Sequence, residues 1–430
     1  MKQTINRGDF VDINELLQGH KCSCGQSHNC PIKYVYIEKN AEKRLNNILD
    51  RNERILVVAD ENTYSAAGNQ VVNALTGKTI KKVIFTGKEI LVPDEKAIKT
   101  VEENIGDSTA IVGIGSGVIQ DLCKYVSMSK KVPYVIVATA PSMDGYASDG
   151  AAMILGGMKV TVKAGLPLAI LADPAVLKCA PMDMIRAGYG DIIGKFSALN
   201  DWEISRCIND EYFCKWIYDI TMEQVKRTIS LAKGITERNE TAVAALMEAL
   251  VIVGIMMSFA GSSRPASGSE HHLSHYFEIT GILENKPYLS HGIDVAYSTV
   301  VTAAIREKIV RNPFPYNRYV LSFDKYESEM KRVYSSSAKG CMELQKKVGN
   351  YDKDRSPIYK AKWDEIKEIL SKMPSASEIK SILSVAGYDM EKFYDFYGKD
   401  KISDAVKWAK DLKDRFTVLW VNYDLYNGEI

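Results

Sequence analysis

The order of hydrophobic and polar residues divides the chain into an α/β part and a helical part. Between residues 34 and 173, short runs rich in valine and isoleucine alternate with segments whose apolar residues recur at helical spacing. The predicted strands span 34–38, 54–60, 81–87, 110–115, 132–140 and 168–173, with a hairpin-like pair before the last of them. Uninterrupted apolar runs are typical of a parallel sheet covered by helices on both faces. We therefore predict a doubly wound, Rossmann-like α/β domain.

After residue 180 the pattern is helical throughout. Helices are predicted over 182–205, 212–236, 241–259 and 292–310, with a further helix between the last two. Ser375 and Glu378 form the S-x-x-E pattern of a helix capping box. We predict three segments, namely an N-terminal extension at 1–33, an α/β domain at 34–180 and an all-α domain at 181–430.

Charge and composition narrow the possible partners. The 430 residues include 55 Lys and Arg against 54 Asp and Glu, which gives a net charge of +1. This balance gives no reason to expect a nucleic acid or an anionic membrane as a partner. The longest apolar run, 249–260, is shorter than the roughly 20 residues that span a bilayer, so it is predicted to be a buried core helix. Because the first residues lack the pattern of a signal peptide, we expect a cytoplasmic protein with reduced thiols.

Three glycines mark a candidate phosphate-binding turn. Gly113, Gly115 and Gly117 stand where the strand 110–115 passes into a helix. Glycines there let the backbone approach a pyrophosphate, and the free N–H groups of the helix N-terminus attract its charge. The spacing is G-x-G-x-G and not the usual G-x-G-x-x-G, so a purely structural turn stays open. Asp60, at the end of an upstream strand, is a candidate for binding a ribose hydroxyl or for an ordinary helix cap.

Histidines gather in one short stretch of the chain. Four of the six, His271, His272, His275 and His291, fall within 262–291. In a helix His271 and His275 project from the same face, and imidazole is the commonest metal ligand among side chains. This clustering predicts a transition-metal site, with histidines that cap helices or lie in the core as the alternative.

Such a site needs an anionic ligand from elsewhere in the chain. Asp191 is the best candidate, since it follows a predicted glycine-rich turn that can lie at the domain junction. Lys195 follows four residues later on the same helical face, so an exposed ion pair is the competing interpretation. The apolar neighbours Ile192, Ile193 and Phe196 argue against that exposure.

A second group of soft ligands lies near the N-terminus. Cys22, Cys24, His28 and Cys30 fall within nine residues, which is the composition of a small structural metal site. The spacing C-x-C-x3-H-x-C matches no common zinc motif, so a redox or incidental cluster is the alternative. The other five cysteines are predicted to be mainly small buried hydrophobic residues: Cys123, Cys179, Cys207, Cys214 and Cys341.

Five segments together resemble one known family. They are GIGSGVIQD (113–121), TAPSMDGYAS (139–148), GYGDIIGK (188–195), SRPASGSEHHLSH (263–275) and SHG (290–292). In this order they closely resemble the glycerol-1-phosphate dehydrogenases, which belong to the superfamily of glycerol dehydrogenase, iron-type alcohol dehydrogenases and dehydroquinate synthase. The match covers roughly 57–304 and includes neither the N-terminal extension nor the last 120 residues. It implies a dehydroquinate synthase-like architecture, with a dinucleotide-binding domain followed by a metal- and substrate-binding domain.

The resemblance implies a chemistry as well as a fold. The reaction would be the reversible, NAD(P)H-dependent reduction of dihydroxyacetone phosphate to glycerol-1-phosphate, in phospholipid metabolism. By similarity the metal ligands are Asp191, His271 and His291, and two neutral nitrogens with one carboxylate leave a divalent ion with open positions. Zinc fits these ligands, and iron and nickel tolerate them too. The metal would polarise the ketone and stabilise the alkoxide that forms as hydride arrives.

Further roles are assigned to residues of the same motifs. Asp144, Lys195 and His275 are predicted to be catalytic, with His275 as a substrate or proton-relay contact and an Asx-turn as the structural alternative for Asp144. Lys195 and Arg264 are the predicted contacts of the substrate phosphate. The predicted cofactor contacts are Asp60, Gly115, Ser116, Gly117, Asp121, Thr139, Ser142 and Ser148.

Several choices stay open at this point. Asp60 and Glu61 would repel a 2′-phosphate and favour NADH, whereas Lys81, Lys82 and Lys88 could accept NADPH. The alternatives for the activity are oxidation of an unphosphorylated polyol such as glycerol, a dehydroquinate synthase-like cyclisation, or a catalytically silent metal- or nucleotide-binding regulator. The expected partners are a small phosphorylated substrate and further copies of the chain.

Overall fold

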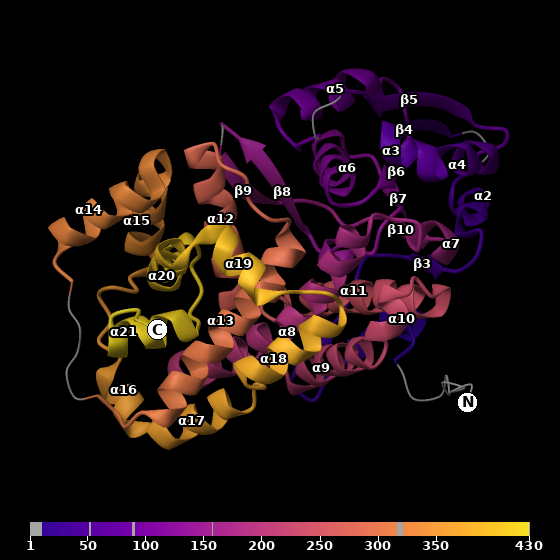
Figure 1. Cartoon of the computed structure of the whole chain (residues 1–430). Helices are drawn as coiled ribbons and strands as arrows, with labels where there is room; N and C mark the ends of the chain where they lie inside the picture. The colour runs from indigo at the N-terminus through magenta and orange to yellow at the C-terminus, as the bar shows by residue number, and fades with distance from the viewer. Residues whose placement is uncertain (1–10, 51–52, 88–90, 157, 316–320, 430) are drawn as a thin grey trace.

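The chain folds into an α/β part and a helical part that pack against each other (Figure 1). The computed structural model describes residues 11–50, 53–87, 91–156, 158–315 and 321–429. A six-stranded parallel sheet has the order β3 (Tyr34–Ile37), β10 (Ala169–Ala172), β7 (Tyr134–Ala138), β6 (Ala110–Gly115), β4 (Arg54–Asp60) and β5 (Thr79–Phe85). The predicted fold class is confirmed.

Alternate residues of the central strand β4 enter two different cores. Leu56 and Val58 pack with residues of α5 (Glu95–Ile105) and α6 (Gly117–Lys130), whereas Ile55, Val57 and Ala59 pack with α2 (Leu45–Ile48) and α4 (Asn69–Ala74). Both faces of the sheet are therefore covered. This explains the uninterrupted apolar run of β4, because its residues from Ile55 to Ala59 are all buried.

An antiparallel hairpin interrupts the α/β order. Strands β8 (Gly150–Leu155) and β9 (Met158–Lys163) pair outside the main sheet. The hairpin-like pair was expected after residue 157, so only β9 lies where it was predicted and the first strand begins earlier, at Gly150. The 3-10 helix η4 (Asp144–Ala147) precedes them, and the short helix α7 (Pro174–Leu177) follows β10.

Long helices build the second part. They are α8 (Met182–Asn209), α9 (Lys215–Ser230), α10 (Ala232–Thr236), α11 (Glu240–Ala260), α12 (Ser269–Glu284) and α13 (His291–Arg311). The glycine-rich turn predicted before Asp191 is wrong, because Gly188 and Gly190 lie inside α8. A Cβ on Gly188 would collide with the carbonyl oxygen of Pro141, and one on Gly190 would lie 2.5 Å from that of Gly292. These glycines therefore permit close packing and not a turn.

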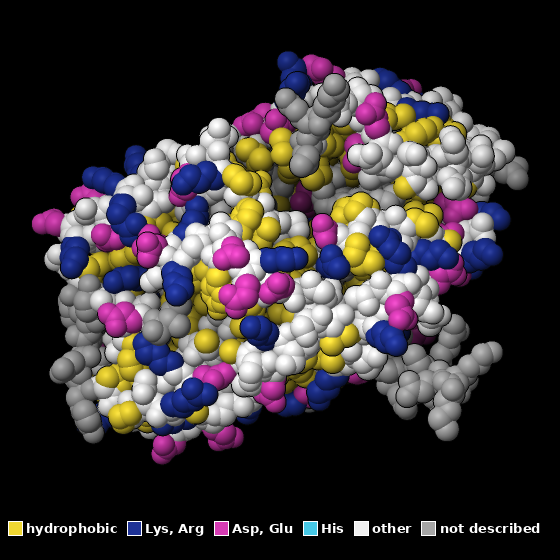
Figure 2. Space-filling view, in the orientation of Figure 1, with side chains coloured by type: hydrophobic (Ala, Val, Ile, Leu, Met, Phe, Trp, Pro, Cys, Tyr) yellow, Lys and Arg dark blue, Asp and Glu magenta, His cyan; other side chains and the backbone are white. Residues whose placement is uncertain are grey.

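Shorter helices from the last third of the chain pack on this bundle. They are α14 (Phe323–Tyr334), α15 (Ala338–Val348), α16 (Ser356–Ala361), α17 (Trp363–Ser371), α18 (Ala376–Val385), α19 (Met390–Tyr397), α20 (Lys399–Trp408) and α21 (Val418–Tyr426). The predicted capping box of Ser375 and Glu378 is present at the start of α18. Figure 2 shows basic and acidic side chains mixed over the visible face, as the charge balance predicts.

Helix α11 is the core helix that the apolar run predicts. Among the described residues it alone is long and apolar enough to cross a bilayer, but it is largely buried inside the protein. The N-terminal segment packs near its end. This segment contains α1 (Ile13–Leu17) and a two-stranded hairpin of β1 (His20–Lys21) and β2 (Ser27–His28). Ile13 and Leu16 share one core with residues of α11.

Candidate active site

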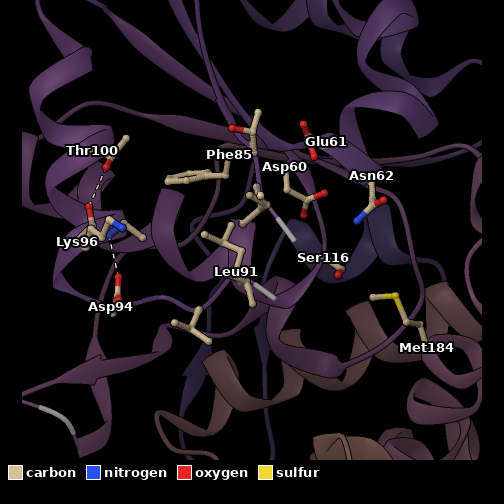
Figure 3. A pocket seen from close by; sticks show the side chains of 16 residues that line it. Asp60, Glu61, Asn62, Phe85, Leu91, Asp94, Lys96, Thr100, Ser116 and Met184 are labelled. Carbon is tan, nitrogen blue, oxygen red and sulfur yellow. Dashed lines mark hydrogen bonds between the residues drawn. The ribbon is translucent and has the colours of Figure 1, made fainter. Parts of the chain in front are cut away.

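A pocket of about 730 Å³ lies at the carboxyl edge of the parallel sheet. Asp60 at the end of β4 and Ser116 after β6 line it from neighbouring strands, and Met184 reaches it from α8 (Figure 3). The chain leaves β4 toward β5 but leaves β6 toward β7, so the strand order reverses between these two strands. Such a reversal is where doubly wound sheets bind nucleotides.

The glycines in and just after β6 have two separate functions. A Cβ on Gly113 would lie 2.8 Å from the sulfur of Cys123, and one on Gly115 would lie 2.7 Å from Ile119 Cβ, so both allow α6 to pack on the sheet. Gly117 begins α6, and the preceding Ser116 makes no side-chain cap. The first N–H groups of α6 therefore have no capping side chain from Ser116, and Val118 and Ile119 of its first turn line the pocket, where a helix N-terminus favours an anion.

Of the eight predicted cofactor contacts, Asp60 and Ser116 line this pocket. Asp60 also caps α3 (Glu61–Thr63), because its carboxylate accepts the Thr63 N–H at 2.8 Å, so the structural alternative is realised as well. Asp121 lies 3.7 Å from the buried ammonium of Lys124. Three further candidates, Thr139, Ser142 and Ser148, follow β7, where the Thr139 N–H donates to Gly115 and the Ser148 hydroxyl donates to Gly145.

The residues relevant to the choice of nicotinamide cofactor are only partly described. Glu61 lines the pocket beside Asp60. Lys82 lies on β5 and donates to the Tyr64 hydroxyl at 3.0 Å. Lys88 lies outside the described residues. The choice between NADH and NADPH therefore stays a prediction.

Three helices bring the predicted metal ligands together. Asp191 comes from the middle of α8, His271 from the first turn of α12 and His291 from the start of α13. One donor atom of each lies within 4.8 Å of the others, with Asp191 Oδ1 3.6 Å from His271 Nε2. Two imidazoles and one carboxylate at this spacing suit a divalent ion with positions left for a substrate.

A carboxylate that the sequence analysis did not single out orients one ligand. His271 Nδ1 lies 2.6 Å from Glu270 Oε1, so its N–H donates to that carboxylate and leaves Nε2 free to face Asp191. Burial, assisted by Lys195, holds the pKa of His271 well below its ordinary value, which keeps the imidazole neutral. Both effects prepare His271 as a ligand, because a second hydrogen bond fixes the tautomer and the orientation of a metal-bound histidine. The only sequence signal was its position beside His271.

Asp144, Lys195 and Asp191 form a buried charge cluster. The Lys195 ammonium lies 2.5 Å from Asp191 Oδ1 and 2.6 Å from Asp144 Oδ2, and the Asp144 N–H donates to Asp191 Oδ2 at 2.9 Å. Lys195 is fully buried, which excludes the exposed ion pair. Burial opposes its charge, but attraction to both carboxylates raises the pKa of Lys195, while burial and Asp191 raise the pKa of Asp144. These contacts favour a role of Lys195 in positioning the carboxylates over direct binding of phosphate.

The other two clustered histidines differ from each other. The His275 ring is centred 5.4 Å from that of His291 and borders the metal cluster. Burial lowers the pKa of His275 to about 3, although Glu278 opposes the shift, so this imidazole is neutral at physiological pH. His272 is fully buried and neither ring nitrogen has a hydrogen-bond partner among the described residues. His275 therefore borders the candidate metal ligands, whereas His272 is a buried core residue.

Arg264 was predicted to contact the substrate phosphate, but its guanidinium is paired with other groups of the protein. Its guanidinium donates to Glu211 Oε1 at 2.6 Å, to the carbonyl oxygen of Phe416 at 2.7 Å and to the Ser205 hydroxyl at 3.2 Å. Its donors are therefore engaged with protein groups, and the residue is 5% exposed. We correct the interpretation to a structural role, since a buried guanidinium that is already paired has little capacity left for a phosphate.

Comparison with known proteins agrees with this geometry. Residues 36–181 match the family model described as iron-containing alcohol dehydrogenase. The chain is 31% identical to the glycerol-1-phosphate dehydrogenase [NAD(P)+] of Geobacillus thermodenitrificans over 90% of its length and 89% of that protein. The chain belongs to the glycerol-1-phosphate dehydrogenase family. The enzyme of that name from Halalkalibacterium halodurans is 30% identical over 95% of this chain and 98% of its own.

The fold of this glycerol-1-phosphate dehydrogenase family member recurs in solved structures. A probable glycerol dehydrogenase from Sinorhizobium meliloti superposes with a TM-score of 0.58 at 15% identity, covering 93% of this chain and 92% of the other. This similarity supports the order of a parallel-sheet part followed by a helical part. It carries no information on the substrate, because the sequences have diverged too far.

Proposed function

We propose that this protein is an NAD(P)-dependent glycerol-1-phosphate dehydrogenase, which reversibly reduces dihydroxyacetone phosphate. The observation that carries the proposal is the meeting of Asp191, His271 and His291 from three helices, in a chain whose curated relatives have this activity. Residues 34–180 would bind the nicotinamide cofactor, and 181–430 the metal and the substrate. We also propose that the enzyme acts in the cytoplasm as a homo-oligomer.

The three ligands fit a divalent metal, and zinc is the ion we propose. Bound there, it would polarise the ketone and stabilise the negative charge on oxygen after hydride transfer. Glu270 would hold His271 in the ligand tautomer, and Lys195 would fix the Asp191 carboxylate. His275, kept neutral by burial, would pass a proton to or from the substrate oxygen.

The substrate phosphate needs cations other than Arg264. Lys413 and Arg415 lie in the segment before α21, and their charges act on the buried histidines, Lys413 on His275 and Arg415 on His271. Arg415 donates to the Ser267 carbonyl and to the Ser263 hydroxyl, both at 2.7 Å. We propose Lys413 as the principal phosphate contact, with Arg415 as a neighbour that adds positive potential.

The test compares substrates in the metal-loaded enzyme. Steady oxidation of NADH or NADPH is expected with dihydroxyacetone phosphate and only slow oxidation with dihydroxyacetone. The product should resist a dehydrogenase specific for glycerol-3-phosphate, and the His291→Ala variant should lose both metal and activity. Comparable rates with dihydroxyacetone would support a polyol dehydrogenase, and no net use of the nicotinamide would support a cyclase.

A further inference from the structure

The N-terminal cysteine cluster has a different composition from the one predicted. The structure brings Cys22, Cys24 and His28 together with Cys214, the residue directly before α9. Cys30 does not belong to this group, and its thiol is buried against other residues. The prediction of Cys30 as a ligand is therefore wrong. Cys214 is buried in the core, as predicted, and also lies among these candidate ligands.

All four donor atoms of this cluster lie within 4.8 Å of one another, and three of their separations are close to the edges of a tetrahedral zinc site. Cys22 Sγ lies 3.5 Å from Cys214 Sγ, and His28 Nε2 lies 3.5 Å from Cys24 Sγ and 3.6 Å from Cys214 Sγ. Zinc–sulfur and zinc–nitrogen bonds in a tetrahedron give edges of about 3.8 Å between sulfurs and about 3.6 Å between sulfur and nitrogen. A disulfide between Cys22 and Cys214 would instead need sulfurs about 2.0 Å apart.

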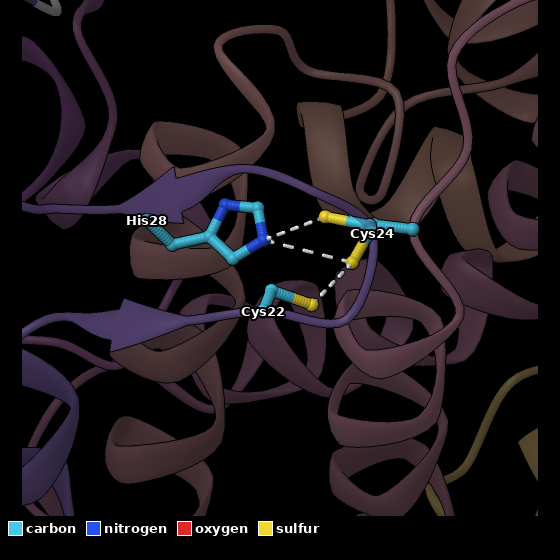
Figure 4. A group of neighbouring side chains, drawn as sticks. Cys22, Cys24 and His28 are labelled. Carbon is cyan, nitrogen blue, oxygen red and sulfur yellow. Dashed lines mark hydrogen bonds between the residues drawn. The ribbon is translucent and has the colours of Figure 1, made fainter.

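The histidine is oriented as a ligand. His28 Nδ1 lies 2.9 Å from the carbonyl oxygen of Phe259, near the end of α11, so its N–H donates to that oxygen. The unprotonated Nε2 is then directed to the sulfurs, and Figure 4 shows this edge of the ring facing them. A backbone carbonyl on the outer nitrogen is a common outer-sphere arrangement around structural metals. The His28 side chain is nearly fully buried.

Other neighbours lie close to the sulfurs and cover the histidine. Cys214 is the N-cap of α9, where the helix dipole favours a negative sulfur, whereas burial raises the pKa of its thiol. The Tyr212 hydroxyl lies 3.4 Å from Cys24 Sγ and can donate to it. The ring of Trp216 lies nearly parallel to that of His28, with their centroids 5.8 Å apart, and so covers one side of the site.

We infer that Cys22, Cys24, His28 and Cys214 form a structural zinc site, separate from the catalytic metal site. The four ligands close the first shell, so this ion would have no open position for a substrate. The site joins the hairpin of β1 and β2 to the loop before α9 and to the end of α11. Its function would be to fix the N-terminal segment on the helical part.

The test counts metals and identifies sulfur ligands in the full-length protein. We expect about two zinc ions per chain in the wild type, one in Cys214→Ser and one in His291→Ala, and two in Cys30→Ser, the matched control. After cobalt substitution, the wild type, Cys30→Ser and His291→Ala should show an intense thiolate-to-cobalt charge-transfer band. Cys214→Ser should lose it. Absence of this band in the wild type, or its loss in Cys30→Ser alone, would overturn the inference.

Thiol protection in the wild type decides the matter even if Cys214→Ser does not fold. With zinc bound, Cys22, Cys24 and Cys214 should react with an alkylating reagent at least about tenfold more slowly than after a chelator has removed the zinc. The reason is that the electron pair with which each thiolate attacks the reagent is then bound to the metal. The exposed Cys179 should react equally in both states. Equal rates for the three ligands with and without zinc, or a Cys22–Cys214 disulfide in the isolated protein, would contradict the site. Activity is not needed for this readout, so the result is independent of the proposed function.

Discussion

Replacing Lys195 by methionine tests whether the charge cluster and the metal depend on each other. The ammonium lies within 2.6 Å of both Asp144 and Asp191 and is fully buried. Methionine keeps most of the volume and removes the charge, so two buried carboxyl groups lose their shared cation. Breaking a buried ion pair from one side costs about 3–5 kcal/mol. We expect the metal-free variant to lose about that much of its free energy of unfolding.

A bound divalent cation should offset part of this loss. The metal neutralises Asp191 directly, so the variant needs Lys195 less when the site is loaded. By linkage, the difference between the losses in the two states equals the change in metal affinity. We expect the loaded variant to lose less by at least about 1.4 kcal/mol, which corresponds to tenfold tighter metal binding. Activity should still fall, because Asp144 and Asp191 are no longer held in place.

The assay is urea unfolding of wild type and variant with excess zinc and with a chelator, followed by circular dichroism. Lys124→Met is the matched control, since Lys124 is equally buried but donates to the carbonyl oxygens of Gly145 and Gly150 and does not touch the metal ligands. Lys124→Met should lose the same free energy of unfolding with excess zinc and with the chelator. An equal loss for Lys195→Met with and without zinc, or no loss at all, would refute the coupling.

Three further changes test single contacts. Glu270→Gln should weaken metal binding by about 10–100-fold in a chelator competition, because it weakens the hydrogen bond that orients His271. An unchanged metal affinity would show that Glu270 does not orient His271. Arg264→Ala should lower the free energy of unfolding by about 3–5 kcal/mol, because it removes the cation that pairs with Glu211. The KM for dihydroxyacetone phosphate should stay near the wild-type value. A rise in this KM alone would show that Arg264 binds the substrate phosphate after all. Lys413→Ala should raise the KM for dihydroxyacetone phosphate about tenfold, which corresponds to the loss of about 1.4 kcal/mol from one charged contact. The KM for the nicotinamide cofactor should not change. The same KM for dihydroxyacetone phosphate in variant and wild type would exclude Lys413 as the phosphate contact.

The fold could be predicted because its signals are local. Strands β4, β6 and β7 are buried on both faces, so each appears as an apolar run whatever its neighbours are. The proposed metal ligands could be singled out for a related reason, since His271 and His291 lie in one histidine-rich stretch. Asp191 was the candidate carboxylate from its apolar sequence context, and the motif resemblance then implied all three as ligands.

What sequence reasoning missed depends on contacts between distant segments. Cys214 follows Cys22 by 192 positions, and only the packing of the hairpin on the loop before α9 brings their sulfurs together. No spacing rule could distinguish Cys214 from Cys207 or Cys341. Arg264 was misassigned because a motif shows which residues occur together and not which carboxylate each one meets. Its partner Glu211 lies 53 positions away.

The glycines beside the metal ligands connect the fold to the site. A turn and a close helix contact both require glycine, and only the second occurs here. Gly190 of α8 lies against the carbonyl oxygen of Gly292. A Cβ on Gly292 would collide with the carbonyl oxygen of Ala187, so α8 and α13 cross at these residues. Asp191 and His291 are their immediate chain neighbours. Alanine normally stabilises a helix by about 1 kcal/mol relative to glycine, but here it would push the two helices apart and separate the ligands. The missing side chains therefore allow two proposed metal ligands from segments 100 residues apart to meet.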